Sequence, residues 1–245
     1  MNLLSIPLAL CTLAGLAALS LPTLAEQRLA YAENAPQWLQ AVGKLHVPGV
    51  HIEEGRRRHL RENCSGTLVA RPNSTRADVV VTAWHCLEFY RDLSKPISFT
   101  LLPGSDLAIH REAYRLADGG GMYADWALLK LHQPVDTRAI PAMVPSSQPG
   151  DLRQPVTMAG FSGDEGLGED GSVLTYHPQC QITRQQRLES ETDCSAYKGA
   201  SGGAVIQLSD QGQARLTGVI SRGNSEDVSI YVPLTAFRGA LEQHL

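Results

Sequence analysis

The chain has 245 residues, of which 43% are hydrophobic and 19% are charged, and its formal net charge is −4 at pH 7. This balance is typical of a globular protein and excludes an intrinsically disordered one. The weak negative charge gives no support for a nucleic-acid partner, and the length suffices for one large or two small domains with a substantial core.

The first 25 residues are apolar. Residues 1–25 contain no Lys, Arg, Asp or Glu, residues 3–21 are mostly Leu and Ala, and small residues end the segment before Glu26. This pattern predicts a secretory signal cleaved after Ala25. An uncleaved membrane anchor is the alternative, but Pro7, Pro22 and the small-residue ending favour cleavage. We therefore expect a secreted or periplasmic protein with no stable membrane association, and residues 26–40 as a short leader or propeptide.

The rest of the chain consists of short apolar runs. Gly, Pro, Ser and Asn separate them, and helical periodicity is scarce. Many short strands at regular spacing are typical of all-β barrels or sandwiches. Pro233 predicts the start of a C-terminal helix, since proline is tolerated at the first helical position. The expected strands span residues 66–70, 79–82, 97–102, 126–131, 156–161, 172–176, 204–208, 216–220 and 228–232.

A proline-rich stretch divides the chain into two similar halves. Residues 136–153 contain Pro141, Pro145 and Pro149 and few strand signals, which favours a linker. We place the first half at residues 41–140, the linker at 141–153 and the second half at 154–245. A cleft between two such halves is a common position for a catalytic site.

Residues 163–171, rich in glycine and acidic residues, are expected to form a solvated loop rather than a calcium site.

The cysteines are consistent with export. Cys11 lies in the predicted signal, and four cysteines remain in the mature chain. An even number in an exported chain indicates disulfides, and the absence of C-x-x-C argues against a zinc site. Three pairings are possible. We favour the two local bridges, Cys64 with Cys86 and Cys180 with Cys194.

Three segments hold the residue types needed for acyl transfer. Residues 199–203 (G-A-S-G-G) place Ser201 between glycines, where a tight turn can present both its hydroxyl and backbone N–H groups. A serine hydroxyl needs a base, and His85 in residues 82–86 (T-A-W-H-C) can supply one. Asp125, at the start of the apolar run 126–131, can fix the tautomer of that histidine.

In this order, the three segments resemble the signature segments of the chymotrypsin-like (trypsin-like) serine peptidases, and the bacterial V8-like branch most of all. The resemblance implies two six-stranded antiparallel β-barrels with the active site between them and a C-terminal helix. It also implies a secreted endopeptidase that acts on proteins or peptides through an acyl-enzyme, with no metal or other cofactor. We expect a monomer.

The resemblance assigns further residues. The N–H groups of Gly199 and Ser201 would form the oxyanion hole. Ser195 would lie at the base of the primary specificity pocket, and Ser221 and Gly223 would bind substrate, with Ser221 also bonding near Asp125. Many family members have an aspartate directly before the nucleophile, which pairs with a newly cut N-terminus. Ala200 stands there, so we expect a site that needs no freed amine.

Parts of the sequence are also compatible with two other functions. A catalytically silent, trypsin-like binding module is the alternative, although such relatives usually lose a triad residue and this chain keeps all three. Residues 199–203 also satisfy the G-x-S-x-G elbow of α/β-hydrolase esterases. That motif requires a helix after the serine and a histidine late in the chain, whereas here a β-branched run follows and His85 comes first.

Overall fold

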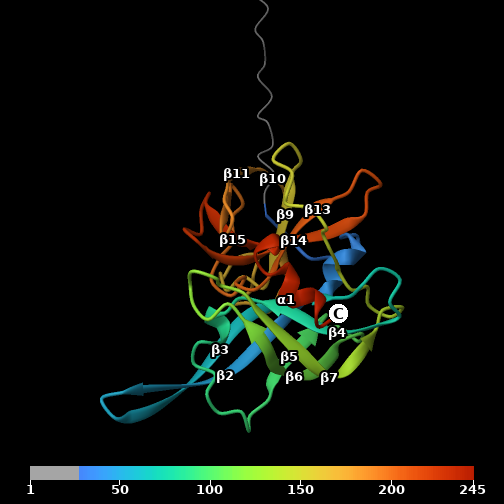
Figure 1. The fold of residues 1–245 in the computed structure, drawn as a ribbon. Helices are drawn as coiled ribbons and strands as arrows, with labels where there is room; N and C mark the ends of the chain where they lie inside the picture. The colour runs from blue at the N-terminus through green and yellow to red at the C-terminus, as the bar shows by residue number, and fades with distance from the viewer. Residues whose placement is uncertain (1–27) are drawn as a thin grey trace, which may run out of the picture.

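A computed structural model describes residues 28–245, so the predicted signal lies outside the described residues. The chain folds into two β-sheet halves, stacked one above the other (Figure 1). One half is a closed barrel and the other is a curled sheet. The predicted all-β class is confirmed. A small helix, α1 (Arg238–Glu242), lies near the C-terminus.

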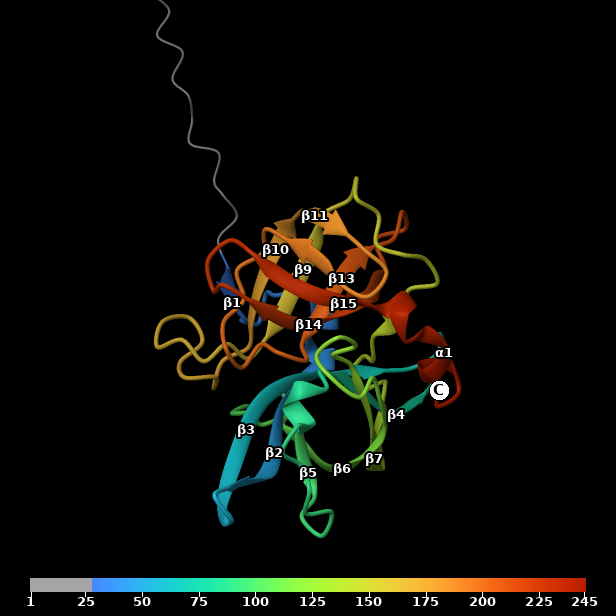
Figure 2. The same cartoon turned by 60° about the vertical axis from the view of Figure 1, so that its left-hand side comes forward.

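The first half is an antiparallel barrel of six strands in the order β2-β3-β4-β7-β6-β5. Its closed ring is visible in Figure 2. Alternating buried and partly exposed residues along β2 reflect the two-residue period of a strand with one face on the core. The strands are β2 (Val42–Glu53), β3 (Arg56–Val69), β4 (Arg76–Thr82), β5 (Ile97–Leu101), β6 (Ile109–Asp118) and β7 (Ala127–Asp136).

The second half is a nine-stranded sheet in the order β1-β10-β9-β13-β14-β15-β12-β11, with β8 beside β14. It is curled but not closed, because its two end strands, β1 and β11, do not pair. The strands are β1 (Leu29–Ala30), β8 (Val144–Pro145), β9 (Val156–Gly160), β10 (Thr175–Cys180), β11 (Ile182–Gln185), β12 (Ser190–Thr192), β13 (Ala204–Leu208), β14 (Ala214–Gly223) and β15 (Ser229–Pro233).

Three apolar clusters of the described residues hold the fold together. One fills the first barrel around Phe99 and Leu129, and one lies within the second half around Tyr231. The third joins the halves, since it contains Val81 and Leu128 of the first and Phe161 of the second. The hydrophobic effect therefore stabilises the relative position of the two halves as well as each half.

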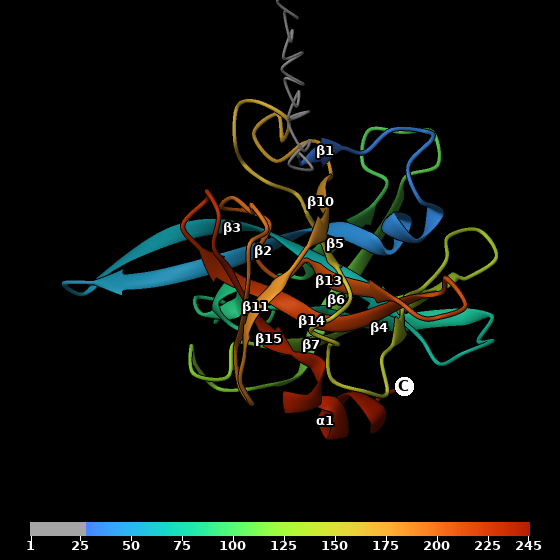
Figure 3. The ribbon, with the colours of Figure 1, turned by 90° about the horizontal axis from the view of Figure 1, so that it is seen from above.

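Both ends of the described chain pack against this core. Leu39, in the 3₁₀ turn η1 (Gln37–Ala41), is fully buried, and β1 pairs with β10. Figure 3 shows β1 beside β10, at the opposite side of the molecule from α1.

Near the other end, the predicted C-terminal helix is confirmed, but it does not begin at Pro233. Pro233 is the last residue of β15 and pairs with Gly218. The chain then forms a 3₁₀ turn, η3 (Leu234–Ala236), before α1, and Phe237 stacks on Trp126 of the first half.

Two disulfides have the local pairing favoured from sequence. Cys64 in β3 bonds to Cys86 in the 3₁₀ turn η2 (His85–Leu87), and Cys180 bonds to Cys194. The first bridge fixes the residue after His85 to the barrel wall.

Within residues 28–245, no helix is long and apolar enough to cross a membrane.

The barrel interior leaves no space for a side chain at Gly43 of β2. A Cβ there would lie 2.5 Å from Cε2 of Phe99 and 2.9 Å from the carbonyl oxygen of Thr100. We predict that Gly43→Ala lowers the free energy of unfolding by about 1–3 kcal/mol, measured by urea denaturation. Gly239→Ala is the control, because nothing lies within 4 Å of its Cβ position. Equal stability of the two variants would contradict the packing described.

Candidate active site

His85 and Asp125 lie close together because His85 follows the end of β4, Asp125 precedes the start of β7, and these two strands are neighbours. Thr82 at the end of β4 pairs with Ala127 at the start of β7. The Nδ1 atom of His85 lies 2.8 Å from Oδ2 of Asp125, and the backbone N–H of His85 donates to Oδ1 at 2.9 Å. A proton on Nδ1 completes the first contact and leaves Nε2 as a hydrogen-bond acceptor.

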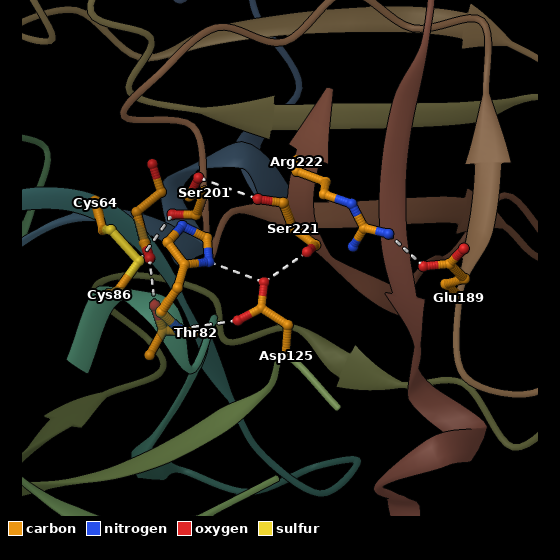
Figure 4. A network of polar contacts seen from close by, with 10 residues as sticks. Cys64, Thr82, Cys86, Asp125, Glu189, Ser201, Ser221 and Arg222 are labelled. Carbon is orange, nitrogen blue, oxygen red and sulfur yellow. Dashed lines mark hydrogen bonds and ion pairs between the residues drawn. A yellow bond between two sulfur atoms is a disulfide. The ribbon is translucent and has the colours of Figure 1, made fainter. Parts of the chain in front are cut away.

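Asp125 is a fully buried carboxylate with three donors. Besides the two from His85, the Ser221 hydroxyl donates to Oδ2 at 2.5 Å, as Figure 4 shows. Burial by itself raises the pKa of the Asp125 carboxyl, but hydrogen bonds from His85 and Ser221, with the attraction of His85, bring the pKa below its ordinary value. The carboxylate is therefore ionised at neutral pH.

Ser201 lies in the loop between β12 and β13. Its hydroxyl donates to the carbonyl oxygen of Ser221 at 3.2 Å (Figure 4). Within residues 28–245, this carbonyl is its hydrogen-bond acceptor, and the hydroxyl makes no hydrogen bond to His85. Ser221 thus contacts both the candidate nucleophile, through its backbone, and the candidate acid, through its side chain.

Ser65 of β3 anchors the turn that contains Ser201. The N–H of Ser65 donates to the carbonyl of Ser201 at 2.8 Å, and the Ser65 hydroxyl donates to the carbonyl of Gly199 at 2.8 Å. The same hydroxyl accepts from the N–H of Phe161 at 2.8 Å. A first-half side chain therefore fixes the second-half turn.

Two glycines of this turn have positive φ. Gly199 has φ +97°, and a Cβ there would lie 2.5 Å from the carbonyl oxygen of Phe161. Gly202 has φ +81°, and its Cβ would clash with the carbonyl oxygen of Ser65 and Oγ1 of Thr82. Only glycine meets both the backbone and the space requirements at these positions.

The residues expected to bind substrate are held by neighbouring strands and loops of the second half. Ser195 donates its hydroxyl to the carbonyl of Glu226, and its N–H donates to Nδ1 of His177 at 2.9 Å. Gly223 ends β14 opposite Ser229. Between Ser221 and Gly223, the Arg222 side chain bonds to Glu189 at 2.5 Å (Figure 4).

Within residues 28–245, two groups of side chains have the composition of metal ligands. One contains His85 with the Cys64–Cys86 pair, and the other contains His177 with the Cys180–Cys194 pair. Both pairs are disulfides, so no thiolate is available to a metal at either group. The expectation of no metal ligands stays a prediction.

Sequence reasoning missed Ser65 and Arg28. Ser65 follows Cys64 in an ordinary strand pattern, and its partners at 161, 199 and 201 lie about 100 or more positions away. Arg28 contacts Asp164 across 136 positions, in a loop that was expected only to be solvated. No local pattern carries such pairings.

The chain is similar to known proteins in its sequence, through a family match, and in its fold. Residues 64–219 match the family described as trypsin-like peptidase domain. No curated protein matches the sequence.

Two solved structures share the fold. The Rv3671c protease from M. tuberculosis in its active form has a TM-score of 0.59 and 17% identity, over 84% of this chain and 81% of that one. The thermostable serine protease AL20 from an extremophilic microorganism has a TM-score of 0.59 and 18% identity, over 81% of this chain and 93% of that one. At these identities, the likeness shows the fold alone.

The crowding at Gly202 gives a prediction for stability. Gly202→Ala combines the left-handed backbone with a clash, whereas Gly212→Ala has φ +72° and nothing within 4 Å. We expect the Gly212 variant to lose roughly 1–2 kcal/mol of unfolding free energy from backbone strain. The Gly202 variant should lose about 1–3 kcal/mol more, since β3 and β4 must move. Equal losses in thermal or urea unfolding would show that the turn does not pack on the barrel as described.

Proposed function

The chain belongs to the trypsin-like peptidase domain family, and on this premise we propose that it is a serine endopeptidase with Ser201, His85 and Asp125 as its catalytic triad. One observation carries the proposal: a fully buried, ionised Asp125 orients His85, and Ser221 links that carboxylate to the glycine-bounded Ser201. Burying a carboxylate is costly, and three donors directed at it offset that cost. Such an arrangement suits a group that must stabilise a developing imidazolium.

Each residue then has a defined step. His85, with its proton on Nδ1, takes the Ser201 proton at Nε2 as Oγ attacks the substrate carbonyl carbon. The imidazolium returns this proton to the leaving amine, and an acyl-enzyme remains. Water, deprotonated by His85, then releases the acid and restores Ser201. Asp125 holds the ring and its charge throughout.

The Ser201 hydroxyl must change acceptor for this chemistry. It bonds to the Ser221 carbonyl, and in the proposed mechanism a rotation about χ1 transfers the hydroxyl hydrogen bond to His85. Catalytic hydrogen bonds are often loose without substrate and tighten in the complex. The cost is small, because one ordinary hydrogen bond replaces another.

The N–H groups of Gly199 and Ser201 are the proposed oxyanion hole. The positive φ of Gly199 and the anchoring of its carbonyl by Ser65 support this assignment. In the described part of the chain, neither N–H donates to a protein acceptor, so both are free for the oxyanion. Losing one such donor costs about 2.7–4 kcal/mol of transition-state stabilisation.

For specificity, we place Ser195 at the base of the primary pocket, with Ser221 and Gly223 along its wall. Ser195 carries no charge, and its hydroxyl is bonded to the Glu226 carbonyl. An uncharged residue at the base cannot itself pair with Lys or Arg, which favours an apolar or small polar side chain before the scissile bond; a carboxylate of Glu226 or Asp227 entering from the next loop is the alternative. Membership of the V8-like branch stays a prediction.

Export of the protein is part of the proposal. Two disulfides in the described residues fit an oxidising compartment, and residues 1–25 have the pattern of a signal. Proteins or peptides are the proposed substrates, and a monomer is the proposed state.

A fluorophosphonate tests the triad without knowledge of the substrate. We predict a single adduct on Ser201 by mass spectrometry of the intact and digested protein, and no adduct in Ser201→Ala. His85→Ala should react at least about 100-fold more slowly, because the general base is lost. Ser147→Ala, which removes an exposed serine of the 146–149 turn, should react like the wild type. A folded, disulfide-bonded protein that forms no adduct would sink the proposal.

Ser221 gives a second prediction, since its hydroxyl donates to Asp125. Ser221→Ala should lower kcat/KM by roughly 10- to 150-fold, equivalent to about 1.5–3 kcal/mol for a hydrogen bond to a charged group. Peptide hydrolysis under single-turnover conditions measures this loss. An unchanged kcat/KM would remove Ser221 from the proposed mechanism.

The same variant should change acid stability. Because the folded pKa of Asp125 is lowered, its contribution to stability is present above the unfolded pKa and is lost as pH falls through the folded value. Ser221→Ala removes one cause of that lowering, so the acid unfolding midpoint should move to higher pH. Ser229→Ala is the control, since it removes a buried hydroxyl that donates to the neutral Cys194 carbonyl. An equal shift in both variants would contradict this account of Asp125.

A further inference from the structure

Arg28, at the N-terminal end of the described chain, makes a long-range ion pair that the triad does not explain. Its two terminal nitrogens donate to the two carboxylate oxygens of Asp164 at 2.7 and 2.6 Å. The Arg28 side chain is 10% exposed and that of Asp164 is 16% exposed. Two other Arg–Asp ion pairs in the described residues, those of Arg138 and Arg153, join residues two apart in the sequence and are largely exposed. The Arg28 pair is therefore a built tertiary contact.

The same guanidinium covers an aromatic ring of the turn before the nucleophile. The Cζ atom of Arg28 lies 4.3 Å from the ring centroid of Tyr197. A cation at this distance over an aromatic face is attracted by the ring electrons. Tyr197 comes two residues before Gly199, and the Ala200 N–H donates to the Tyr197 carbonyl at 3.0 Å. Arg28 thus holds the beginning of the turn that supplies the proposed oxyanion hole.

Asp164 belongs to a loop that is itself bonded to the same turn. The N–H of Gly163 donates to the carbonyl of Lys198 at 2.6 Å. Lys198 precedes Gly199, so this bond fixes the peptide group that contains the Gly199 N–H. The Arg28 guanidinium bonds to Asp164, the residue after Gly163, and lies over Tyr197, the residue before Lys198. It therefore contacts the chain on both sides of this hydrogen bond.

The Asp164 loop is tightly wound around its carboxylate. The N–H of Gly168 donates to Oδ2 at 3.3 Å, and the N–H of Asp170 donates to the Asp164 carbonyl at 3.0 Å. A Cβ at Gly168 would clash with the Ser162 carbonyl, so the loop backbone packs closely against the segment that precedes it. The hydrogen bond from Arg28 also lowers the pKa of Asp164, which keeps the pair ionised near neutral pH.

Arg28 is itself held by the sheet. The next two residues, Leu29 and Ala30, pair with Tyr176 and Thr175 of β10, and the Tyr31 N–H donates to the Leu174 carbonyl at 2.8 Å. Docking of this short strand therefore places the guanidinium over the 197–199 turn.

We propose that Arg28 is a positioning residue for the oxyanion hole: through Asp164 and Tyr197 it holds the Gly199 N–H in place, so that catalytic competence depends on the docking of β1. The inference rests on the proposed function, and it takes residues 28–40 as part of the active chain rather than as a removed propeptide, since β1 pairs with β10 and Leu39 is fully buried. It supplies a means of ordering the turn in a chain that has Ala200 where a buried aspartate would pair with a freed N-terminus. Lysine cannot replace this bidentate contact, because an ammonium makes no parallel pair of hydrogen bonds to a carboxylate.

Kinetics separate positioning from general stability. We expect Arg28→Ala to lower kcat by about 10- to 100-fold with KM changed less than about threefold, since a displaced donor loses part of an oxyanion-hole contribution. Affinity for a peptidyl trifluoromethyl ketone should fall by the same factor, whereas affinity for the cleaved product peptide should not change. Arg28→Lys should recover only part of the loss.

Further variants keep the test decisive. Asp164→Asn preserves side-chain shape and should also lower kcat while leaving KM little changed. This variant replaces Arg28→Ala in the test if Arg28→Ala does not fold. The double variant Arg28→Ala/Asp164→Asn should lose no more than either single one, because the pair acts as a unit. Arg153→Ala is the matched control, since it breaks an exposed Arg–Asp fork that does not contact the turn, and it should match the wild type.

The outcomes distinguish this inference from the proposed function. If the wild type cleaves peptides and Arg28→Ala retains wild-type kcat, the positioning role is wrong and the peptidase assignment stands. A loss in which product affinity falls together with ketone affinity would also overturn it, because the whole cleft would then be perturbed. If the wild type neither cleaves peptides nor reacts with a fluorophosphonate, the proposed function fails and the inference fails with it.

Discussion

The arrangement of the whole site depends on the buried side chain of Ser65. Its hydroxyl donates to the Gly199 carbonyl and accepts from the Phe161 N–H, and its own N–H donates to the Ser201 carbonyl. Its carbonyl accepts from Thr82 Oγ1. The polar groups of one first-barrel residue thus bind the second half and the strand that leads to His85. His85 and Ser201 come from different halves, so their separation is set by this junction and by the apolar cluster around it.

The second constraint is the charge of Asp125. A carboxylate with no exposed surface requires its donors, and these come from both halves: His85 from the first and Ser221 from the second. The ion pair between Arg28 and Asp164 instead stays within the second half, since β1 pairs with β10. Two ionised carboxylates therefore act on the site, one that orients the base and one that, in our proposal, orders the oxyanion hole.

Local patterns predicted the all-β class and most strand positions, because alternation and turn residues are short-range signals. They also identified three candidates, since His85, Asp125 and Ser201 each lie beside a recognisable strand. Pro233 was misread because pairing with Gly218 extends β15 through it. The closure of the second half also differed, since β1 and β11 do not meet. Ser65 and Arg28 could not be found, because their partners are set by the tertiary fold and leave no local pattern.

The most direct test of the account is a crystal structure of the fluorophosphonate adduct. We predict a bond from phosphorus to Oγ of Ser201, with Oγ moved away from the Ser221 carbonyl. The phosphoryl oxygen should lie about 3 Å from the backbone nitrogens of both Gly199 and Ser201. Phosphorus on another residue, or a phosphoryl oxygen turned away from these two N–H groups, would contradict the proposed triad and oxyanion hole.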